Sequence, residues 1–265
     1  YMSFPLGKVS NALYKATTSC NNSTIILIHG NSSSATVWKQ QLESELFSTF
    51  PSIAFDLPGH GESSRTGAYS IPHLIETLKD YIAPFKKTIV VGHSLGGHLA
   101  IEILPYLENC TGLMIIGAPT VKRPINLENA FLPDERMGLL FKKDLNAAEI
   151  HYFANGICKN FQLQEFDVAA TIRNTDPRFR EDIGASVAKG ELADEAGILK
   201  KARIPVAIVN GAEDPFVNGT YLNTLKIPAL WENKVHVFED CGHSPHLEKP
   251  EQFNRLLSNF LKGLI

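Results

Sequence analysis

A serine between two glycines, in the run Gly92-His-Ser-Leu-Gly96, is the part of this chain best suited to chemistry. The residues before it, from Ile89 to Val91, are apolar and β-branched, and the residues after it have helical spacing. This pattern predicts a sharp strand-to-helix turn, in which glycines avoid collisions and Ser94 projects its hydroxyl. Backbone N–H groups at the start of a helix also favour developing negative charge. Ser94 is therefore the predicted nucleophile, although five such residues alone could also form an inert glycine-rich turn.

A general base and an acid to orient it follow Ser94 at the ends of two further predicted strands. Asp214 comes after the apolar run Ile204 to Asn210, in a turn where the neighbouring Glu213 is expected to point to solvent. His243 follows the alternating run 235–240 and a glycine. Because acyl transfer to a serine needs these two partners, Ser94, His243 and Asp214 are predicted to form a catalytic triad.

Donors for a tetrahedral oxyanion are expected in the loop after an earlier strand, Ile25 to Ile28. The backbone N–H groups of Asn31 and Leu95 are the predicted pair. The serines of the same loop, 32–34, are also expected to cap a helix that begins near Ala35. The two roles are compatible, since one uses backbone groups and the other side chains.

These motifs together resemble the α/β-hydrolase fold superfamily over nearly the whole chain. The resemblance is carried by His29-Gly30-Asn31, Asp56-Leu-Pro-Gly-His-Gly-Glu-Ser63, Gly92-His-Ser-Leu-Gly96, Asp214 and Gly242-His243. In that fold the triad follows the chain order serine, acid, histidine, which is the order here. The resemblance implies an α/β fold with a mostly parallel central sheet, helices on both faces and a helical cap insertion. The turn at Asp56 is interpreted as structural and is left out of the triad.

More narrowly, the chain resembles the metal-independent N-acyl-homoserine lactone lactonases of this fold, which open the lactone ring of quorum-sensing signals. The matching runs are His-Gly-Asn-Ser-Ser-Ser, Asp-Leu-Pro-Gly-His-Gly, Ser-Leu-Gly-Gly-His and Val-Asn-Gly-x-x-x-Pro-Phe-Val. The resemblance implies that Asn31 contacts the oxyanion or the ligand and that Tyr152 hydrogen-bonds the substrate. Two residues depart from it: Asp214 stands where the lactonases carry glutamate, and His93 where they carry tryptophan. His93 is thus a further candidate substrate contact.

Strand-like and helical runs alternate along most of the chain, which indicates a parallel sheet covered on both faces. A core of residues 1–121 and 197–265 is expected to carry a helical cap of residues 122–196, because strand signals vanish there. Such a cap would lie over the nucleophile and supply an apolar wall. The residues of the cap that could line a pocket are Phe131, Met137, Leu140, Tyr152, Phe153 and Phe161.

Composition limits the partners and cofactors. The chain has 265 residues, 44% of them hydrophobic, and a net charge of -3 without a long basic run, which argues against binding nucleic acid or an anionic membrane. A neutral small-molecule ester or lactone is the expected substrate. No leader or membrane span is evident, and four dispersed cysteines suggest reduced thiols, so a cytoplasmic protein is expected. The oligomeric state stays open.

No cofactor and no metal are expected. Although nine histidines are present, the chain lacks the H-x-H-x-D-H sequence of dinuclear metal lactonases, and His243 with His246 forms an isolated pair. His60 and His98 are interpreted as hydrogen-bonded structural residues.

The predicted function is hydrolysis of an ester or lactone through an acyl-enzyme, most specifically N-acyl-homoserine lactone ring opening in quorum quenching. A general carboxylesterase and a carbon–carbon bond hydrolase share every motif, and a non-catalytic ligand-binding protein on the same fold is a further alternative. Haloalkane dehalogenases and epoxide hydrolases are disfavoured, because they use a carboxylate where this chain has Ser94.

Overall fold

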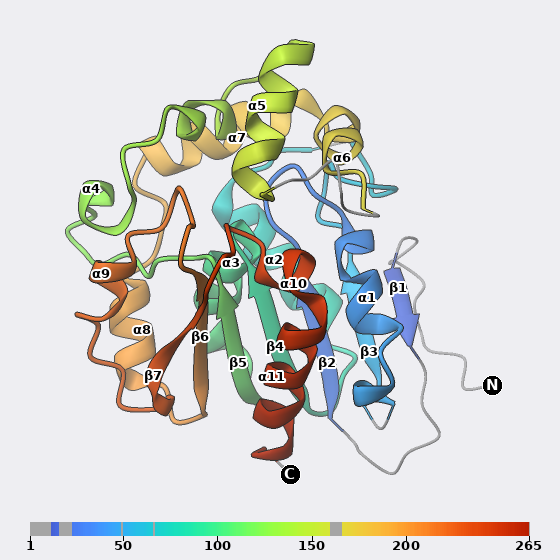
Figure 1. The fold of residues 1–265 in the computed structure, drawn as a ribbon, viewed down its shortest axis with the longest axis vertical. Coiled ribbons are helices and arrows are strands. Elements are labelled where there is room, and N and C mark those ends of the chain that lie inside the picture. The colour runs from blue at the N-terminus through green and yellow to red at the C-terminus, as the bar shows by residue number, and fades with distance from the viewer. Residues whose placement is uncertain (1–11, 16–22, 49, 66, 160–165, 265) are drawn as a thin grey trace.

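The structure, a computed structural model, describes residues 12–15, 23–48, 50–65, 67–159 and 166–264. Within these ranges a seven-stranded sheet forms the centre of the molecule, with the strand order β1-β3-β2-β4-β5-β6-β7 (Figure 1). The strands are β1 (Ala12–Lys15), β2 (Thr24–Ile28), β3 (Ser52–Phe55), β4 (Thr88–His93), β5 (Cys110–Ile116), β6 (Val206–Gly211) and β7 (Leu230–Phe238). β1 pairs antiparallel with β3, and all other pairs are parallel.

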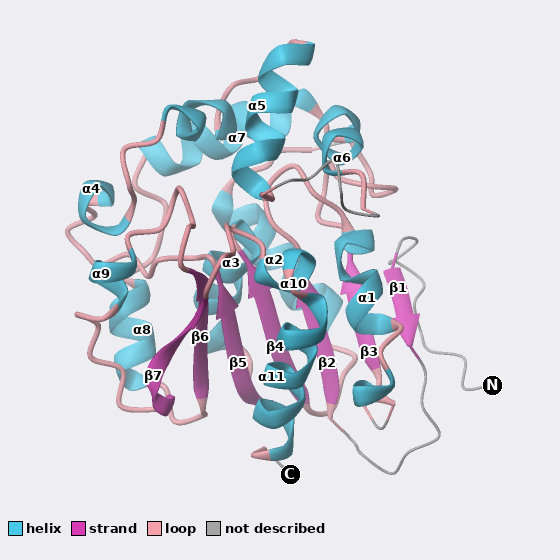
Figure 2. Ribbon diagram, viewed as in Figure 1, coloured by secondary structure: helices cyan, strands magenta, loops and turns pink. Residues whose placement is uncertain are grey.

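The apolar strands are buried because helices cover both faces of the sheet (Figure 2). The 3₁₀ and α-helices before residue 122 are η1 (Ala35–Trp38), α1 (Lys39–Leu42), η2 (Glu45–Phe47), α2 (Ile71–Ile82), α3 (Leu95–Ile103) and η3 (Leu104–Tyr106). Those after it are α8 (Glu195–Lys201), α9 (Gly219–Leu222), α10 (Pro245–Glu248) and α11 (Pro250–Lys262). Helices α1, α10 and α11 lie on one face, and α2, α3 and α8 lie on the other (Figure 1).

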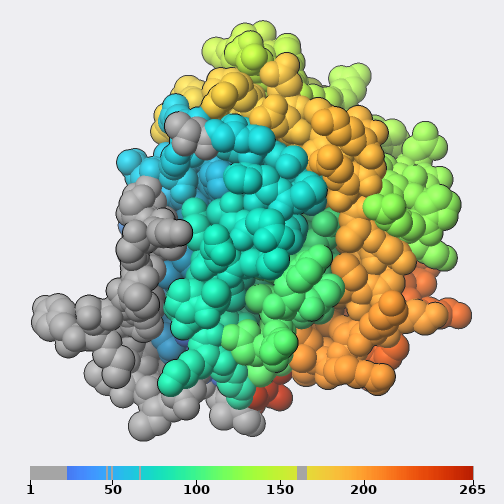
Figure 3. Space-filling model, turned by 180° about the vertical axis from the view of Figure 1, so that it is seen from behind, coloured from blue at the N-terminus to red at the C-terminus, as the bar shows by residue number. Residues whose placement is uncertain are grey.

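A group of helices from residues 122–196 lies beyond the carboxyl ends of the parallel strands (Figures 1 and 2). They are α4 (Leu127–Ala130), η4 (Glu135–Leu140), α5 (Ala147–Ile157), α6 (Val168–Asn174) and α7 (Pro177–Ala188). From behind, the yellow-to-orange segment with α7 and α8 borders the teal segment with α2 (Figure 3). The backbone N–H of Ile71, at the start of α2, donates to Ser186 of α7 at 2.9 Å. The same edge of the sheet carries the turns that follow β4, β6 and β7, so these helices lie over the candidate site.

The serine run after β2 does not cap the next helix in the way the sequence suggested. Ser34 precedes η1 but makes no capping hydrogen bond with its side chain. The backbone N–H of Ala35 donates instead to Asp56 Oδ1 at 2.7 Å, and that of Glu62 donates to Asp56 Oδ2 at 3.0 Å. The charged carboxylate is the stronger acceptor. Asp56 therefore has a structural role, as expected. It also caps the helix that the serines were predicted to cap.

Three of the cysteines, Cys110, Cys158 and Cys241, are free and buried, and Cys20 lies outside the described residues. Burial raises the pKa of the Cys158 and Cys241 thiols. Among the residues that the structure describes, no helix is both long and apolar enough to cross a membrane.

Candidate active site

Ser94 lies at the turn between β4 and α3, in a backbone conformation that side chains seldom adopt, with φ 53° and ψ -121°. The turn is tight because its backbone packs directly against the first turn of α3 and the end of β2. A Cβ added to Gly92 would lie 2.2 Å from the carbonyl oxygen of Gly96, and one added to Gly96 would lie 2.3 Å from that of Ile28. The two glycines are thus required by close packing, and the turn holds the Ser94 hydroxyl at the start of α3, as predicted.

Replacing Gly92 with alanine is expected to lower the free energy of unfolding by about 3 kcal/mol, because the new Cβ would overlap backbone that cannot move aside. Urea denaturation measures this loss. Gly219→Ala in α9 is the matched control, since nothing lies within 4 Å of a Cβ there, and its effect should stay below about 1 kcal/mol. Equal stability of the two variants would contradict this account of the turn.

Asp214 and His243 form a buried hydrogen-bonded pair at the ends of β6 and β7. Nδ1 of His243 donates to Asp214 Oδ2 at 2.8 Å. The other carboxylate oxygen, Oδ1, accepts the backbone N–H groups of Phe216 at 2.9 Å and Val217 at 3.1 Å. Glu213, by contrast, is exposed, as predicted, and its carboxylate pairs with Lys159 at 2.6 Å. The carboxylate of Asp214 is thus held in one orientation from both sides.

The imidazole of His243 is fixed in its plane as well as by its hydrogen bond. The Phe216 ring meets it edge-on, with centroids 5.0 Å apart and an interplanar angle of 88°. Glu248 accepts the N–H groups of Gly242 at 2.9 Å and Ser244 at 3.1 Å, which fixes the loop that carries the ring. His243 and Ser94 both line one narrow pocket of about 40 Å³. The structure thus brings the three predicted triad residues to one edge of the sheet.

Asn31, from the loop after β2, borders the same narrow pocket, and its side chain is already engaged. Its Nδ2 donates to the Leu140 carbonyl at 2.9 Å, and its Oδ1 accepts the hydroxyl of Ser32 at 2.9 Å. The backbone N–H of Ser32 donates to Nε2 of His60 at 3.0 Å, so His60 is hydrogen-bonded as expected. Leu95 is the first residue of α3, where an N–H has no partner within the helix. The side chain of Asn31 is thus occupied, and the predicted oxyanion donor of this residue is its backbone N–H.

A buried guanidinium joins this loop to the helices above it. Arg180 of α7 is 3% exposed. It donates to the carbonyl groups of Lys142 at 2.8 Å and Lys143 at 2.7 Å, and to the Ser32 hydroxyl at 3.2 Å. With its guanidinium it also reaches the Ile172 carbonyl, at 3.4 Å. One side chain thus connects the segment after η4, the end of α6 and the loop that carries Asn31.

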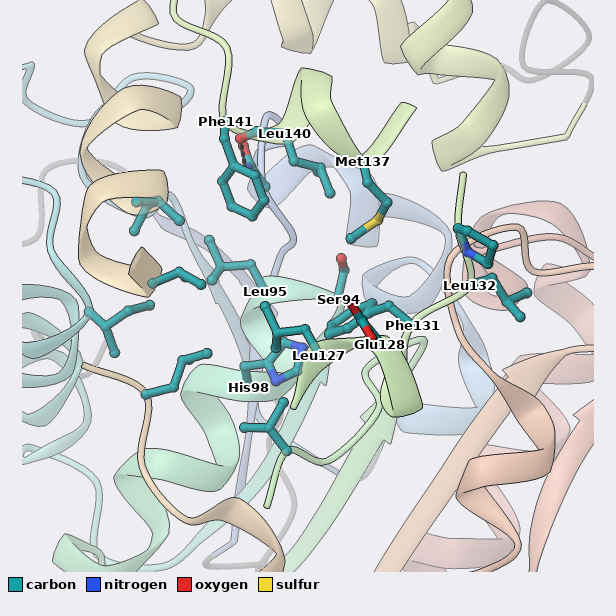
Figure 4. A pocket seen from close by; sticks show the side chains of 17 residues that line it. Ser94, Leu95, His98, Leu127, Glu128, Phe131, Leu132, Met137, Leu140 and Phe141 are labelled. Carbon is teal, nitrogen blue, oxygen red and sulfur yellow. Dashed lines mark hydrogen bonds between the residues drawn. The ribbon is translucent and has the colours of Figure 1, made fainter. Parts of the chain in front are cut away.

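A larger cavity of about 560 Å³ opens beside the serine (Figure 4). The hydroxyl of Ser94 points into it, toward Met137. The residues that line it are Asn31, Ile71, Ser94, Leu95, His98, Val121, Leu127, Glu128, Phe131, Leu132, Pro133, Met137, Leu140, Phe141, Ile183, Val187 and Leu192. Most are apolar, the one carboxylate among them is Glu128, and neither lysine nor arginine is in this set. The cavity is suited to an uncharged, largely apolar group.

The predicted wall residues are only partly in the cavity. Phe131, Met137 and Leu140 line it, whereas Phe153 is fully buried in the core and Phe161 lies outside the described residues. Tyr152 is 46% exposed and lines neither pocket, so the structure does not bring it to the serine. The reason is the helical period: α5 buries Ile150, Phe153, Ala154 and Ile157 on one stripe, and Tyr152 lies off it.

His93 precedes the serine and faces the narrow pocket rather than the larger cavity. Its Nε2 donates to the backbone carbonyl of His243 at 3.0 Å, which leaves Nδ1 buried without a partner in the described chain. Its ring packs on His246, with centroids 4.5 Å apart, and His246 packs on Trp38 at 4.4 Å. Burial and the neighbouring histidines hold the pKa of His93 well below its usual value. A neutral His93 thus supports the loop of His243.

Acid should destabilise the fold steeply, because four buried histidines stay neutral in it. Burial lowers the pKa of His246 to about 3, and it also lowers the pKa values of His29, His60 and His93. Below about pH 6.5 the unfolded chain therefore binds more protons than the folded one. Each such histidine should remove about 1.4 kcal/mol of unfolding free energy per pH unit as the pH falls from about 6.5 toward its folded pKa.

Urea denaturation between pH 7.5 and 5 measures this slope. His246→Leu should reduce this slope by the contribution of about one proton, which is about 1.4 kcal/mol per pH unit. His73→Gln, which removes an exposed imidazole, is the control. A slope that His246→Leu leaves unchanged would contradict the assignment for His246.

The largely parallel sheet and the strained serine turn define the class of protein as an α/β hydrolase. A family model described as the alpha/beta hydrolase family matches residues 25–256, and the chain belongs to that family.

The structure resembles that of the N-acyl homoserine lactonase AidH in a mutant complex with N-hexanoyl homoserine lactone. The TM-score is 0.86 at 29% identity, over 96% of this chain and 95% of that one. An esterase from Thermogutta terrifontis shares the fold, with a TM-score of 0.76 at 20% identity over 96% and 93% of the chains. In sequence, the chain is 26% identical to a 2-hydroxy-6-oxononadienedioate/2-hydroxy-6-oxononatrienedioate hydrolase from Burkholderia vietnamiensis, over 92% of this chain and 89% of that one. The chain is therefore a hydrolase whose neighbours include ester-acting enzymes.

Proposed function

We propose that this hydrolase opens the ring of N-acyl-homoserine lactones through an acyl-enzyme on Ser94. The observation that carries the proposal is that Ser94 borders both a pocket shared with His243 and a largely apolar cavity large enough for an acyl chain. His243 is the general base, and Asp214 holds its imidazole in the tautomer that accepts the serine proton. The similarity to the lactonase AidH supports the lactone as substrate.

In the first half of the reaction, His243 takes the proton of Ser94 as the hydroxyl oxygen attacks the lactone carbonyl. The backbone N–H groups of Asn31 and Leu95 stabilise the oxyanion, at the positive end of α3. Collapse breaks the ring C–O bond, and the alkoxide takes the proton from His243 while it stays tethered to the acyl-enzyme. Water activated by His243 then releases the acyl group as the open-chain hydroxy acid.

Residues 122–196 act in this proposal as a cap that selects the acyl group. Phe131, Met137 and Leu140 bring apolar side chains from this segment to the cavity that Ser94 borders. An apolar wall of this kind binds an acyl chain by removing its apolar surface from water. The free energy gained is about 25 cal/mol for each Å² of apolar surface buried. The substrate is thus a neutral small molecule, and the cap sets the preferred chain length.

A carbon–carbon bond hydrolase is the less favoured reading, and the reason is charge. The substrates named for the Burkholderia vietnamiensis relative are dioates, which carry two carboxylates. The cavity beside Ser94 has no lysine or arginine among its lining residues and does have the carboxylate of Glu128. A dianion would gain no salt bridge there, whereas a lactone or an ester needs none.

The deciding experiment mixes the metal-free protein with N-acyl-homoserine lactones of several chain lengths and with p-nitrophenyl butyrate, and follows proton release and product mass. Ring opening with addition of one water, faster than ester cleavage and lost in Ser94→Ala, supports the lactonase. Ester cleavage without lactone cleavage would instead identify a carboxylesterase. Inactivity on both would overturn the proposal and favour a carbon–carbon hydrolase or a binding protein.

A further inference from the structure

One turn of α3 beyond Ser94, a histidine and a buried glutamate form a hydrogen-bonded pair at the wall of the larger cavity. Nδ1 of His98 donates to Glu195 Oε1 at 2.8 Å and Oε2 at 3.1 Å. Glu195, of α8, is fully buried, and its Oε2 also accepts the N–H of Val121 at 2.8 Å. The carboxylate therefore holds the imidazole in one orientation, with Nδ1 turned away from the cavity that His98 lines.

The second ring nitrogen, Nε2, is available to a ligand. Within the described chain it has no hydrogen-bond partner. Figure 4 shows the imidazole beside Leu127 at the edge of the cavity, and the Phe131 ring lies 6.0 Å from it. Burial alone would lower the pKa of His98, but the charge of Glu195, its hydrogen bond and the nearby Glu102 together raise it. A protonated imidazole has a hydrogen on Nε2, so it offers a donor in apolar surroundings.

We infer that Nε2–H of His98 is a specificity-determining subsite for a neutral oxygen, a keto or hydroxyl group, on the acyl chain of the substrate, about one helical turn from the scissile lactone carbonyl. The inference rests on the proposed function and names its substrate class. Four residues along a helix rise about 6 Å, and Cβ atoms tilt toward the helix N-terminus, so the imidazole leans back toward Ser94. In an N-acyl-homoserine lactone the third acyl carbon is five bonds from the lactone carbonyl carbon that Ser94 attacks, so an oxygen on it can reach the next turn of α3.

The charges around His98 favour a neutral oxygen over a carboxylate. When His98 is protonated, the carboxylate of Glu195 balances its charge, and the pair carries no net charge. Glu102 of α3, whose pKa burial raises to about 7, and Glu128 of α4 add only negative charge. An anion would be repelled, whereas a carbonyl needs one donor. An unsubstituted chain would cover the N–H without bonding it, and the loss of that hydrogen bond is costly in an apolar site.

The test is a ratio of kcat/KM values, for N-(3-oxohexanoyl)- over N-hexanoyl-homoserine lactone. We expect about 10-fold preference for the oxo substrate in the wild-type enzyme. His98→Phe should bring the ratio close to one while the hexanoyl substrate is still cleaved. Glu195→Gln, which keeps an acceptor for Val121 but not the charge, should lower the ratio in part.

A role of His98 in stability alone would lower both rates equally and leave the ratio unchanged, which would overturn the inference. Should His98→Phe fail to fold, a wild-type ratio near one would overturn the inference without any variant.

The wild-type ratio should also fall as the pH rises through the pKa of His98, because the proton on Nε2 is then lost. A ratio that stays constant up to high pH would overturn the inference. The charged groups that surround His98 are Glu195 of α8, Glu102 of α3 and Glu128 of α4.

Failure of the proposed function is distinguishable from failure of the subsite. If no lactone is cleaved, the lactonase proposal is wrong, and the same ratio is measured with ethyl 6-oxononanoate and ethyl nonanoate, in which the keto carbon is again five bonds from the scissile carbonyl. A preference for the oxo ester that His98→Phe removes would support the subsite in an esterase, and equal rates would overturn it.

Discussion

Ser94→Ala should lower kcat by at least about 10⁴-fold on any ester or lactone that the enzyme cleaves, with little change in stability. The acyl-enzyme cannot form without the hydroxyl, and the remaining groups act only as a unit with it. The fold should survive because the Ser94 side chain makes no capping hydrogen bond at the start of α3. Progress curves for the purified variant measure kcat, and urea denaturation checks the fold.

A fluorophosphonate probe provides an independent readout, because it bonds covalently to an activated serine. The wild-type protein should gain the mass of one phosphonyl group, and Ser94→Ala should gain none. Ser48→Ala, which removes an exposed serine, is the control and should label fully. Turnover near the wild-type level in Ser94→Ala, or labelling of that variant, would mean that another residue is the nucleophile.

Asp214→Asn should lower kcat by about 10³- to 10⁴-fold, and the hydrogen bonds at Asp214 give the reason. Oδ1 accepts two backbone N–H groups, from Phe216 and Val217, so the asparagine oxygen is expected to take that place. Its NH₂ group then faces Nδ1 of His243, which must become the acceptor. The proton moves to Nε2, and the imidazole can no longer accept the proton of Ser94.

The neighbouring carboxylate gives a matched control for this variant. Glu213→Gln removes a charge one residue away, where the side chain is exposed and paired with Lys159, and it should change kcat less than about twofold. Measured at one pH on the same substrate, the two variants should differ by about three powers of ten. Similar rates would show that Asp214 does not orient the base.

The parts of the site that sequence could predict are those set by the ends of strands. Ser94, Asp214 and His243 each follow an apolar run closed by turn residues, and parallel strands end at one edge of the sheet. Their meeting place therefore follows from short-range patterns. Capping at Ser34 was predicted wrongly because the competing acceptor, Asp56, is 22 residues away and is brought in only by the pairing of β2 with β3.

The wall of the cavity was less accessible to prediction. Ile183, Val187 and Leu192 line it and were missed, because an apolar residue at helical spacing has the same pattern whether it faces core or cavity. Tyr152 was proposed through resemblance, and its position off the buried stripe of α5 takes it to the surface. His98 was expected to be hydrogen-bonded, as it is, but its partner Glu195 is 97 residues away and could not be foreseen.

The contacts of Arg180 have a consequence for how this enzyme can change over evolution or in the laboratory. Since one guanidinium holds both the segment after η4 and Ser32, next to Asn31, a substitution that moves this segment also moves the loop of the proposed oxyanion donor. New substrate ranges would therefore be reached more readily through wall positions away from that connection, such as Leu127 or Val187, than through the segment around Lys142. Substitutions in the segment around Lys142 that admit a new acyl group would first lower turnover, and a second mutation would be needed to restore it.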